Sequence, residues 1–161
     1  MRRQVFYSFH YANDAMRVQQ IRNMGAFEGN PPASANAWEQ VKRSGDRAIK
    51  NWIDDAMQNK SCVIVLVGSE TASRKWVRYE IEKAWTDGRG LMGIYIHNLR
   101  DPHYGTCQKG ENPFGKFKLG DENLANIVPC HDPLSRDAYW DIKNHLSDWI
   151  EQAIELRKHY N

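Results

Sequence analysis

The sequence predicts an α/β fold in which a parallel sheet of four to five strands has helices on both faces. Short segments rich in β-branched and aromatic residues alternate with segments of helical periodicity from end to end. The most apolar run, residues 62–67 (CVIVLV), is closed by Gly68 and followed by a helical pattern. A buried strand that leads into a helix has this pattern, and repeated alternation favours parallel strands covered on both faces.

The strands are predicted from short β-branched or aromatic runs. They are residues 4–9 (QVFYSF), 62–67, 91–96 (LMGIYI) and the short segment 126–130. Residues 25–37 contain Gly, Asn, Pro and Ser and are predicted as a loop, in which a short edge strand has no recognisable position. Residues 98–123 are rich in Gly and Pro and carry no period, and a loop of this length inside a compact domain is usually functional or disordered.

The helices are predicted from apolar residues that recur on one face. The first follows Asn13 or Asp14 as cap, the second opens at Ser44 and ends near Asn59, and the third is capped by Ser73. A fourth begins after Ser135 and carries basic residues in its last turn, as the helix dipole prefers. Residues 1–161 are therefore predicted to form a single domain.

Composition excludes several classes of function. The chain has 161 residues, 26% of them charged, and a formal net charge of +2. Lys and Arg are scattered among acids, so nucleic-acid binding is not indicated, and no apolar stretch approaches the length that spans a membrane. The three cysteines lack paired spacing, and the N-terminal residues lack a signal-peptide pattern, so the expected location is cytoplasmic.

The predicted topology brings two segments together. In open parallel sheets, ligands bind beyond the carboxyl ends of the strands, where the strand order reverses. If the order is flavodoxin-like, strands 4–9 and 62–67 are neighbours at that point. Residues after each strand would then converge on one crevice. This places Phe9, His10 and Asp14 with a second group, Ser69, Trp76 and Glu80.

Trp76 and Glu80 are the strongest candidates in this crevice. They are four residues apart, so they neighbour each other on the shoulder of the apolar stripe of their helix. A carboxylate beside an indole near the end of a strand is well placed for a catalytic role. The alternative is a solvated glutamate that pairs with Lys83, next to a half-buried core tryptophan, and a short motif such as W-x-x-x-E often matches by accident.

The other candidates each have a structural alternative. His10 is a phosphate or ribose contact or a hydrogen-bonding residue at a strand end, and Asp14 is a ribose ligand or a helix cap. Ser69 lies at a strand-to-helix turn whose free N–H groups suit phosphate, but it is equally a local cap. Irregularly spaced His and Cys residues within 97–107 predict no metal site.

Four stretches together resemble the TIR (Toll/interleukin-1 receptor) domain superfamily, and more closely the ThsB-type TIR-like proteins of bacterial Thoeris anti-phage systems. They are VFYSFHYANDAMRVQQIRN (5–23), WEQVKRSGDRAIKNWID (38–54), VIVLVGSETASRKWVRYEIEKAW (63–85) and GLMGIYIHNLRD (90–101). The resemblance covers most of the chain up to about Asp101, and the combination is far more specific than any one piece.

The resemblance implies a flavodoxin-like fold and an enzyme that cleaves NAD, with NAD as substrate and no cofactor. It assigns the catalytic glutamate to Glu80 and places Trp38 in the site. In the Thoeris type it further implies a cyclic ADP-ribose isomer that signals to a partner effector protein, and it allows for self-association. One carboxylate suffices in principle, because nicotinamide leaves NAD as a neutral group and needs no general acid. A covering loop that excludes water would favour the cyclic product, and residues 98–123 are the candidate lid.

Two other functions remain open. Many TIR domains only assemble with other TIR domains, so a non-catalytic assembly module is the first alternative. A phosphoacceptor switch on the same fold is the second, and it would need clustered acids after the first strand, where this chain has the single Asp14.

Overall fold

The computed structural model describes residues 3–25, 28–29 and 41–160. Within these residues the central sheet has five strands, in the order β2-β1-β3-β4-β7, and every neighbouring pair is parallel. The strands are β1 (Gln4–Ser8), β2 (Glu28–Gly29), β3 (Cys62–Val67), β4 (Gly90–Tyr95) and β7 (Cys130–His131). This order is the flavodoxin-like one, so the predicted fold class is confirmed. The strand order reverses between β1 and β3, which are hydrogen-bonded neighbours.

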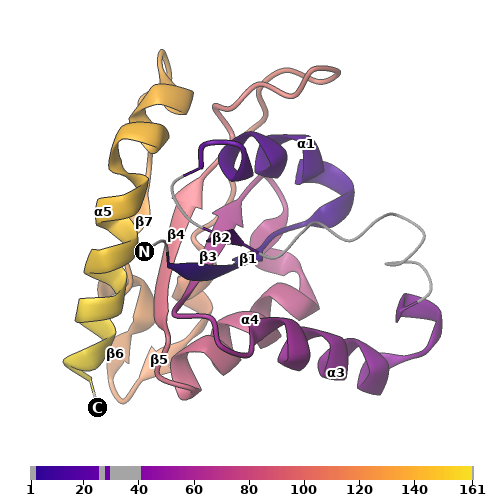
Figure 1. Cartoon of the computed structure of the whole chain (residues 1–161), viewed down its shortest axis with the longest axis vertical. Coiled ribbons are helices and arrows are strands. Elements are labelled where there is room, and N and C mark those ends of the chain that lie inside the picture. The colour runs from indigo at the N-terminus through magenta and orange to yellow at the C-terminus, as the bar shows by residue number, and fades with distance from the viewer. Residues whose placement is uncertain (1–2, 26–27, 30–40, 161) are drawn as a thin grey trace.

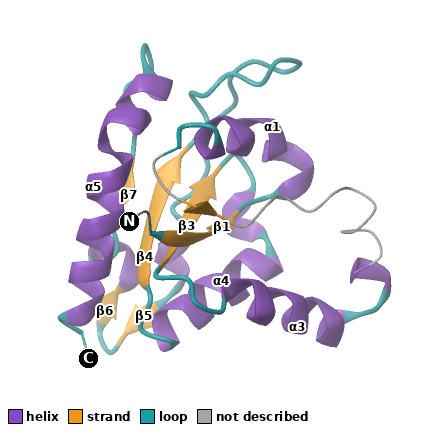
Figure 2. Ribbon diagram, viewed as in Figure 1, coloured by secondary structure: helices purple, strands orange, loops and turns teal. Residues whose placement is uncertain are grey.

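Helices cover both faces of the sheet (Figures 1 and 2). In the described part of the chain they are α1 (Tyr11–Arg22), α3 (Asp46–Met57), α4 (Lys75–Thr86) and α5 (Ala138–Lys158). Figure 2 shows α3 and α4 side by side, across the sheet from α1. Among the described residues, no helix is both long enough and apolar enough to cross a bilayer.

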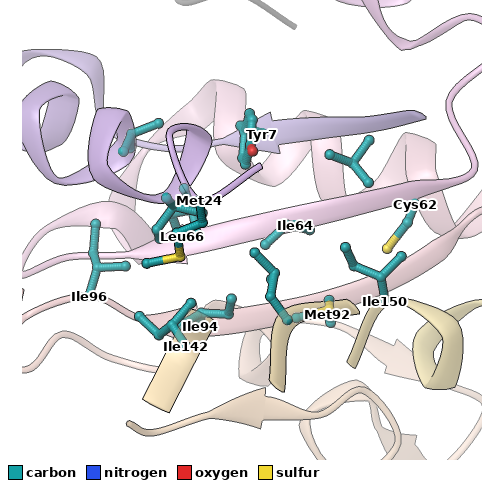
Figure 3. Packing of buried hydrophobic residues seen from close by; sticks show 14 of the residues in the cluster. Tyr7, Met24, Cys62, Ile64, Leu66, Met92, Ile94, Ile96, Ile142 and Ile150 are labelled. Atoms are coloured by element: carbon teal, nitrogen blue, oxygen red, sulfur yellow. The ribbon is translucent and has the colours of Figure 1, made fainter. Parts of the chain in front are cut away.

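Alternation along the strands divides the core into two layers. In β1, Val5 and Tyr7 pack in the layer with α1 and α5, whereas Phe6 packs in the layer with α3 and α4. Figure 3 shows the first layer, in which Tyr7 and Ile64 of neighbouring strands lie above Ile150 of α5. Successive side chains of a strand point to opposite faces, so every residue of β3 is buried against one layer or the other.

The segment predicted as a long loop, residues 98–123, contains short ordered pieces. These are η2 (Pro113–Lys116), β5 (Lys118–Leu119) and β6 (Glu122–Asn123), and η3 (Leu124–Asn126) follows directly. β5 and β6 form an antiparallel hairpin, and Phe114 of η2 is fully buried against the α3–α4 layer. Each piece is too short to show a period, which explains why the sequence did not predict them.

Three predicted boundaries are wrong. The first helix, α1, begins at Tyr11 with His10 as its N-cap, so neither Asn13 nor Asp14 caps it. The final strand, β7, overlaps the predicted segment 126–130 only at Cys130, because η3 and the turn after it occupy the preceding residues. The third helix begins at Lys75, because residues 71–73 form the separate 3-10 helix η1. Ser73 therefore does not cap α4, and its hydroxyl donates to the carbonyl of Glu70.

Candidate functional site

A cavity of about 440 Å³ opens at the carboxyl end of β1, beside the point where the strand order reverses. Three segments surround it: the β1–α1 junction, the α3 region, and the stretch from η1 into α4. The described residues that line it are Phe9, His10, Tyr11, Ala12, Lys42, Trp52, Ile53, Ser73, Arg74, Lys75, Trp76, Val77 and Glu80. Aromatic side chains form much of the wall, so the cavity can enclose a flat or apolar group.

Glu80 is the acidic residue among the described residues that line this cavity. Its side chain is 7% exposed, although it lies in the middle of α4. Burial raises the pKa of Glu80 to about 8, and the hydrogen bond from Ser8 acts in the opposite direction. A solvated glutamate that pairs with Lys83 is excluded, because Glu80 is buried and Lys83 pairs instead with Asp54 and Asp87.

Ser8, the last residue of β1, holds the carboxyl group of Glu80. The Ser8 hydroxyl donates to Glu80 Oε1 over 2.7 Å, and Ser8 itself is 1% exposed. Sequence reasoning missed Ser8 as a site residue. Strand alternation contains the signal, because Ser8 is in phase with Phe6 and so faces the layer that contains α4.

His10 lies both in the cavity wall and at the start of α1. It is the N-cap of that helix, and its Nδ1 accepts a hydrogen bond from the Asn13 N–H over 3.1 Å. The structure thus contains the strand-end hydrogen bond that the sequence offered as one alternative. Because His10 is also part of the lining, its other ring nitrogen is the one available to a ligand.

Of the residues predicted to share one site, Phe9, His10, Trp76 and Glu80 line the cavity. Ser69 is outside the lining, at an exposed turn next to Gly110. Trp38 lies outside the described residues. Residues 98–123, the candidate lid, contribute nothing to the lining in the described structure.

Asp14 is also outside the lining, and it is 1% exposed. Its Oδ1 accepts from Arg17 Nη1 over 3.0 Å, while Oδ2 is buried and has no hydrogen-bond partner among the described residues. Burial raises the pKa of Asp14, and the neighbouring Arg17 guanidinium opposes this shift. In the structure Asp14 belongs to a buried ion pair within α1, where it packs against Gly68.

Gly68 leaves no space for a side chain beside Asp14. A Cβ atom at residue 68 would lie 2.2 Å from Asp14 Oδ2. Gly68→Ala is therefore expected to lower the free energy of unfolding by about 1–3 kcal/mol, the usual cost of overpacking. Urea denaturation measures the change. Gly115→Ala is the matched control, because a Cβ there meets no atom within 4 Å, and an equal loss in both variants would contradict the steric explanation.

Basic residues missed by sequence reasoning stand at the mouth of the cavity. Lys42 and Arg74 are exposed lining residues, and Lys75 pairs with Asp46. Lys42 and Arg74 make no ion pair with any residue that the structure describes. Two cations without an ion pair among the described residues suit an anionic group such as phosphate, and Arg74 also adjoins the first turn of α4.

The site combines a buried carboxylate, aromatic walls and a basic mouth. A carboxylate in such surroundings can stabilise a developing positive charge or bond to it. Among the described residues, no group of three or more His, Cys, Asp or Glu side chains is arranged to hold a metal ion. Glu80 provides the carboxylate for this chemistry among the described residues of the lining.

Comparison with known proteins gives two matches. The family described as "Thoeris protein ThsB, TIR-like domain" matches residues 6–101, which include the end of β1, all of β3 and α4, and every described residue of the cavity lining. A Bacillus cereus (strain MSX-D12) protein, named "Putative cyclic ADP-D-ribose synthase ThsB1", is 39% identical over 119 residues. That match covers 71% of this chain and 62% of the length of the relative.

Proposed function

The chain belongs to the TIR-like domain family of the Thoeris protein ThsB, and from this premise we propose that it is an enzyme that consumes NAD. The reaction is cleavage of the bond between nicotinamide and ribose. The observation that carries the proposal is the single carboxylate of Glu80, 7% exposed, which faces an aromatic-lined cavity at the switch point of the sheet.

One carboxylate matches the needs of this bond. Glycosidases generally use a second carboxyl group to protonate the leaving oxygen. Nicotinamide is already cationic in NAD and leaves as a neutral ring, so no proton donor is required. As the bond breaks, positive charge develops on the ribose carbon. The ionised Glu80 carboxylate stabilises that charge or bonds to the carbon transiently, and the poorly hydrated site strengthens the interaction.

The walls and the mouth of the cavity match the rest of the substrate. Phe9, Trp52 and Trp76 provide apolar surface for the nicotinamide ring. Lys42 and Arg74, which make no ion pair within the described part of the chain, can bind the diphosphate, which carries the negative charge of NAD. In this arrangement the bond between nicotinamide and ribose lies inside the cavity and the diphosphate lies at its mouth.

Removal of the basic mouth is expected to weaken NAD binding. The double variant Lys42→Ala/Arg74→Ala should raise KM for NAD by roughly tenfold or more, because it deletes two charge-assisted contacts, and should change kcat little. Initial rates across a range of NAD concentrations measure both constants. Arg78→Ala is the matched control, since Arg78 is an exposed residue of α4 outside the lining, and the same KM in the double variant and the wild type would contradict the assignment.

The product depends on which nucleophile reaches the ribose carbon. Water gives ADP-ribose, whereas a ring nitrogen or hydroxyl of the same bound molecule gives a cyclic ADP-ribose isomer. The name of the Bacillus cereus relative refers to a cyclic ADP-D-ribose synthase, which supports the cyclic product. The matching family model is that of a Thoeris protein, ThsB. This supports a role for the product as an anti-phage signal that acts on a partner effector protein.

Product analysis distinguishes this enzyme from a TIR module that only assembles. Purified protein is incubated with NAD, and the nucleotides are separated by chromatography with mass detection. The proposal predicts nicotinamide together with a product that has the mass of ADP-ribose less one water. If nicotinamide and ADP-ribose are the sole products, the proposed cleavage stands and the proposed cyclisation is wrong. Unchanged NAD would contradict the proposal that the protein is an enzyme.

A further inference from the structure

Glu80 has one hydrogen-bond partner for its side chain within the described structure, and that partner is Ser8. The Ser8 hydroxyl donates to Oε1 over 2.7 Å. The contact joins the end of β1 to the middle of α4, two elements separated by 72 residues of sequence. No helical neighbour of Glu80 provides a comparable contact, so the direction of the carboxyl group depends on the sheet.

Ser8 is itself rigidly placed. It pairs with Val65 in the parallel ladder between β1 and β3, which are the two strands at the switch point. Its side chain is 1% exposed and lies behind the cavity rather than in its wall, because Ser8 is not one of the lining residues. A ligand in the cavity therefore meets Glu80 and not Ser8.

Among the described residues around Glu80, Ser8 is the one that holds the carboxyl group by a hydrogen bond. The titratable or charged groups that share the cavity with Glu80 are His10, Tyr11, Lys42, Arg74 and Lys75. None of them pairs with the Glu80 carboxyl in the described structure. The sheet beneath α4 presents the apolar side chains of Val63, Val65 and Val67. The facing acid of α3, Asp54, accepts from Tyr79.

We propose that Ser8 is a positioning residue, whose hydroxyl fixes Oε1 of Glu80 so that the other carboxyl oxygen is directed at the reacting ribose carbon. This inference rests on the proposed function. A hydroxyl donor favours the charged carboxylate over the neutral acid, so Ser8 holds the pKa of Glu80 below the value that burial alone would give. Ser8 acts through Glu80 and binds no part of the substrate.

The test compares Ser8→Ala with Ser8→Thr, which keeps the hydroxyl. Ser8→Ala is expected to lower kcat for NAD cleavage at pH 7 by about tenfold and to leave KM nearly unchanged. The acid limb of its pH profile should move up by about one pH unit, because the donor to the carboxylate is lost. Ser8→Thr should restore the wild-type profile, and Ser8→Cys, a weaker donor of similar shape, should lie between them.

Cys62→Ala is the control for a purely structural effect. It removes a buried side chain at the far end of β3 and should leave the pH profile in place. If Ser8→Ala does not fold, Ser8→Cys is the decisive variant, and a wild-type profile in the folded Ser8 variant would overturn the proposal.

A second readout does not depend on catalysis. The carboxyl carbon of Glu80 is followed by ¹³C NMR as a function of pH, and it is assigned by its absence in Glu80→Gln. A higher midpoint in Ser8→Ala than in the wild type supports the role of Ser8, and equal midpoints overturn it. If the wild type releases no nicotinamide, the proposed function fails, while the NMR titration still decides whether Ser8 controls Glu80.

Discussion

Replacing Glu80 with Gln is expected to raise the free energy of unfolding at pH 8.5 by roughly 3–5 kcal/mol relative to the wild type. The folded-state pKa of Glu80 is raised by burial from its ordinary value of 4.5 to about 8. Between these two pH values the folded protein binds more protons than the unfolded chain, so its stability falls as the pH rises. The contribution of the protonated Glu80 side chain to the free energy of unfolding is fully present below pH 4.5 and lost once the pH exceeds about 8. Gln stays neutral and avoids the loss.

Urea denaturation at pH 5 and pH 8.5 measures this effect. The difference between Glu80→Gln and the wild type should be small at pH 5 and should grow by several kcal/mol at pH 8.5. Glu82→Gln is the matched control, because Glu82 is an exposed residue of the same helix and should give no such trend. A difference that is independent of pH would show that Glu80 titrates normally, against the burial described here.

Replacing Arg17 with Met is expected to destabilise the protein by about 3–5 kcal/mol. Arg17 is 3% exposed and donates to Asp14 over 3.0 Å. It also donates to the carbonyls of Leu99 and Gly105, so it ties α1 to the loop after β4. Met has a similar length but no charge, so the variant leaves the buried Asp14 carboxyl and both carbonyls without their donor.

A double-mutant cycle separates the ion pair from the loop contacts. Asp14→Leu/Arg17→Met should recover part of the loss, because no unpaired charge stays buried, and thermal or urea denaturation gives each free energy. Arg3→Met is the control, since the Arg3–Glu151 pair is about half exposed and solvent screening should make its contribution much smaller than that of the buried pair. A loss of equal size in Arg3→Met and Arg17→Met would contradict this account of the buried pair.

The elements that sequence predicted well are those with a long, uniform pattern. The strand at residues 62–67 has the predicted bounds, because an unbroken apolar run ends at Gly68. The helix predicted from Ser44 to near Asn59 is α3, Asp46–Met57. By contrast, β2 has only two residues, and η1 displaces the start of α4, so neither had a pattern long enough to recognise.

The candidate site was predicted in its centre and less well at its edges. The turn from β1 into α1 and the shoulder of α4 both follow from strand-to-helix patterns, so Phe9, Trp76 and Glu80 could be grouped. Asp14 and Ser69 follow the same strands, but side-chain direction places them elsewhere: Asp14 against Arg17, Ser69 at an exposed turn. Lys42 and Arg74 depend on how α3 and α4 pack, which no local pattern encodes.

The most direct test of the central claim compares the release of nicotinamide from NAD by the wild type, Glu80→Gln and Glu82→Gln. The claim is that one buried carboxylate at the switch point breaks the nicotinamide–ribose bond. It predicts that Glu80→Gln lowers kcat by at least about 1,000-fold while it stays folded, and that Glu82→Gln keeps the wild-type rate. Nicotinamide release by Glu80→Gln at a rate close to that of Glu82→Gln would contradict the claim.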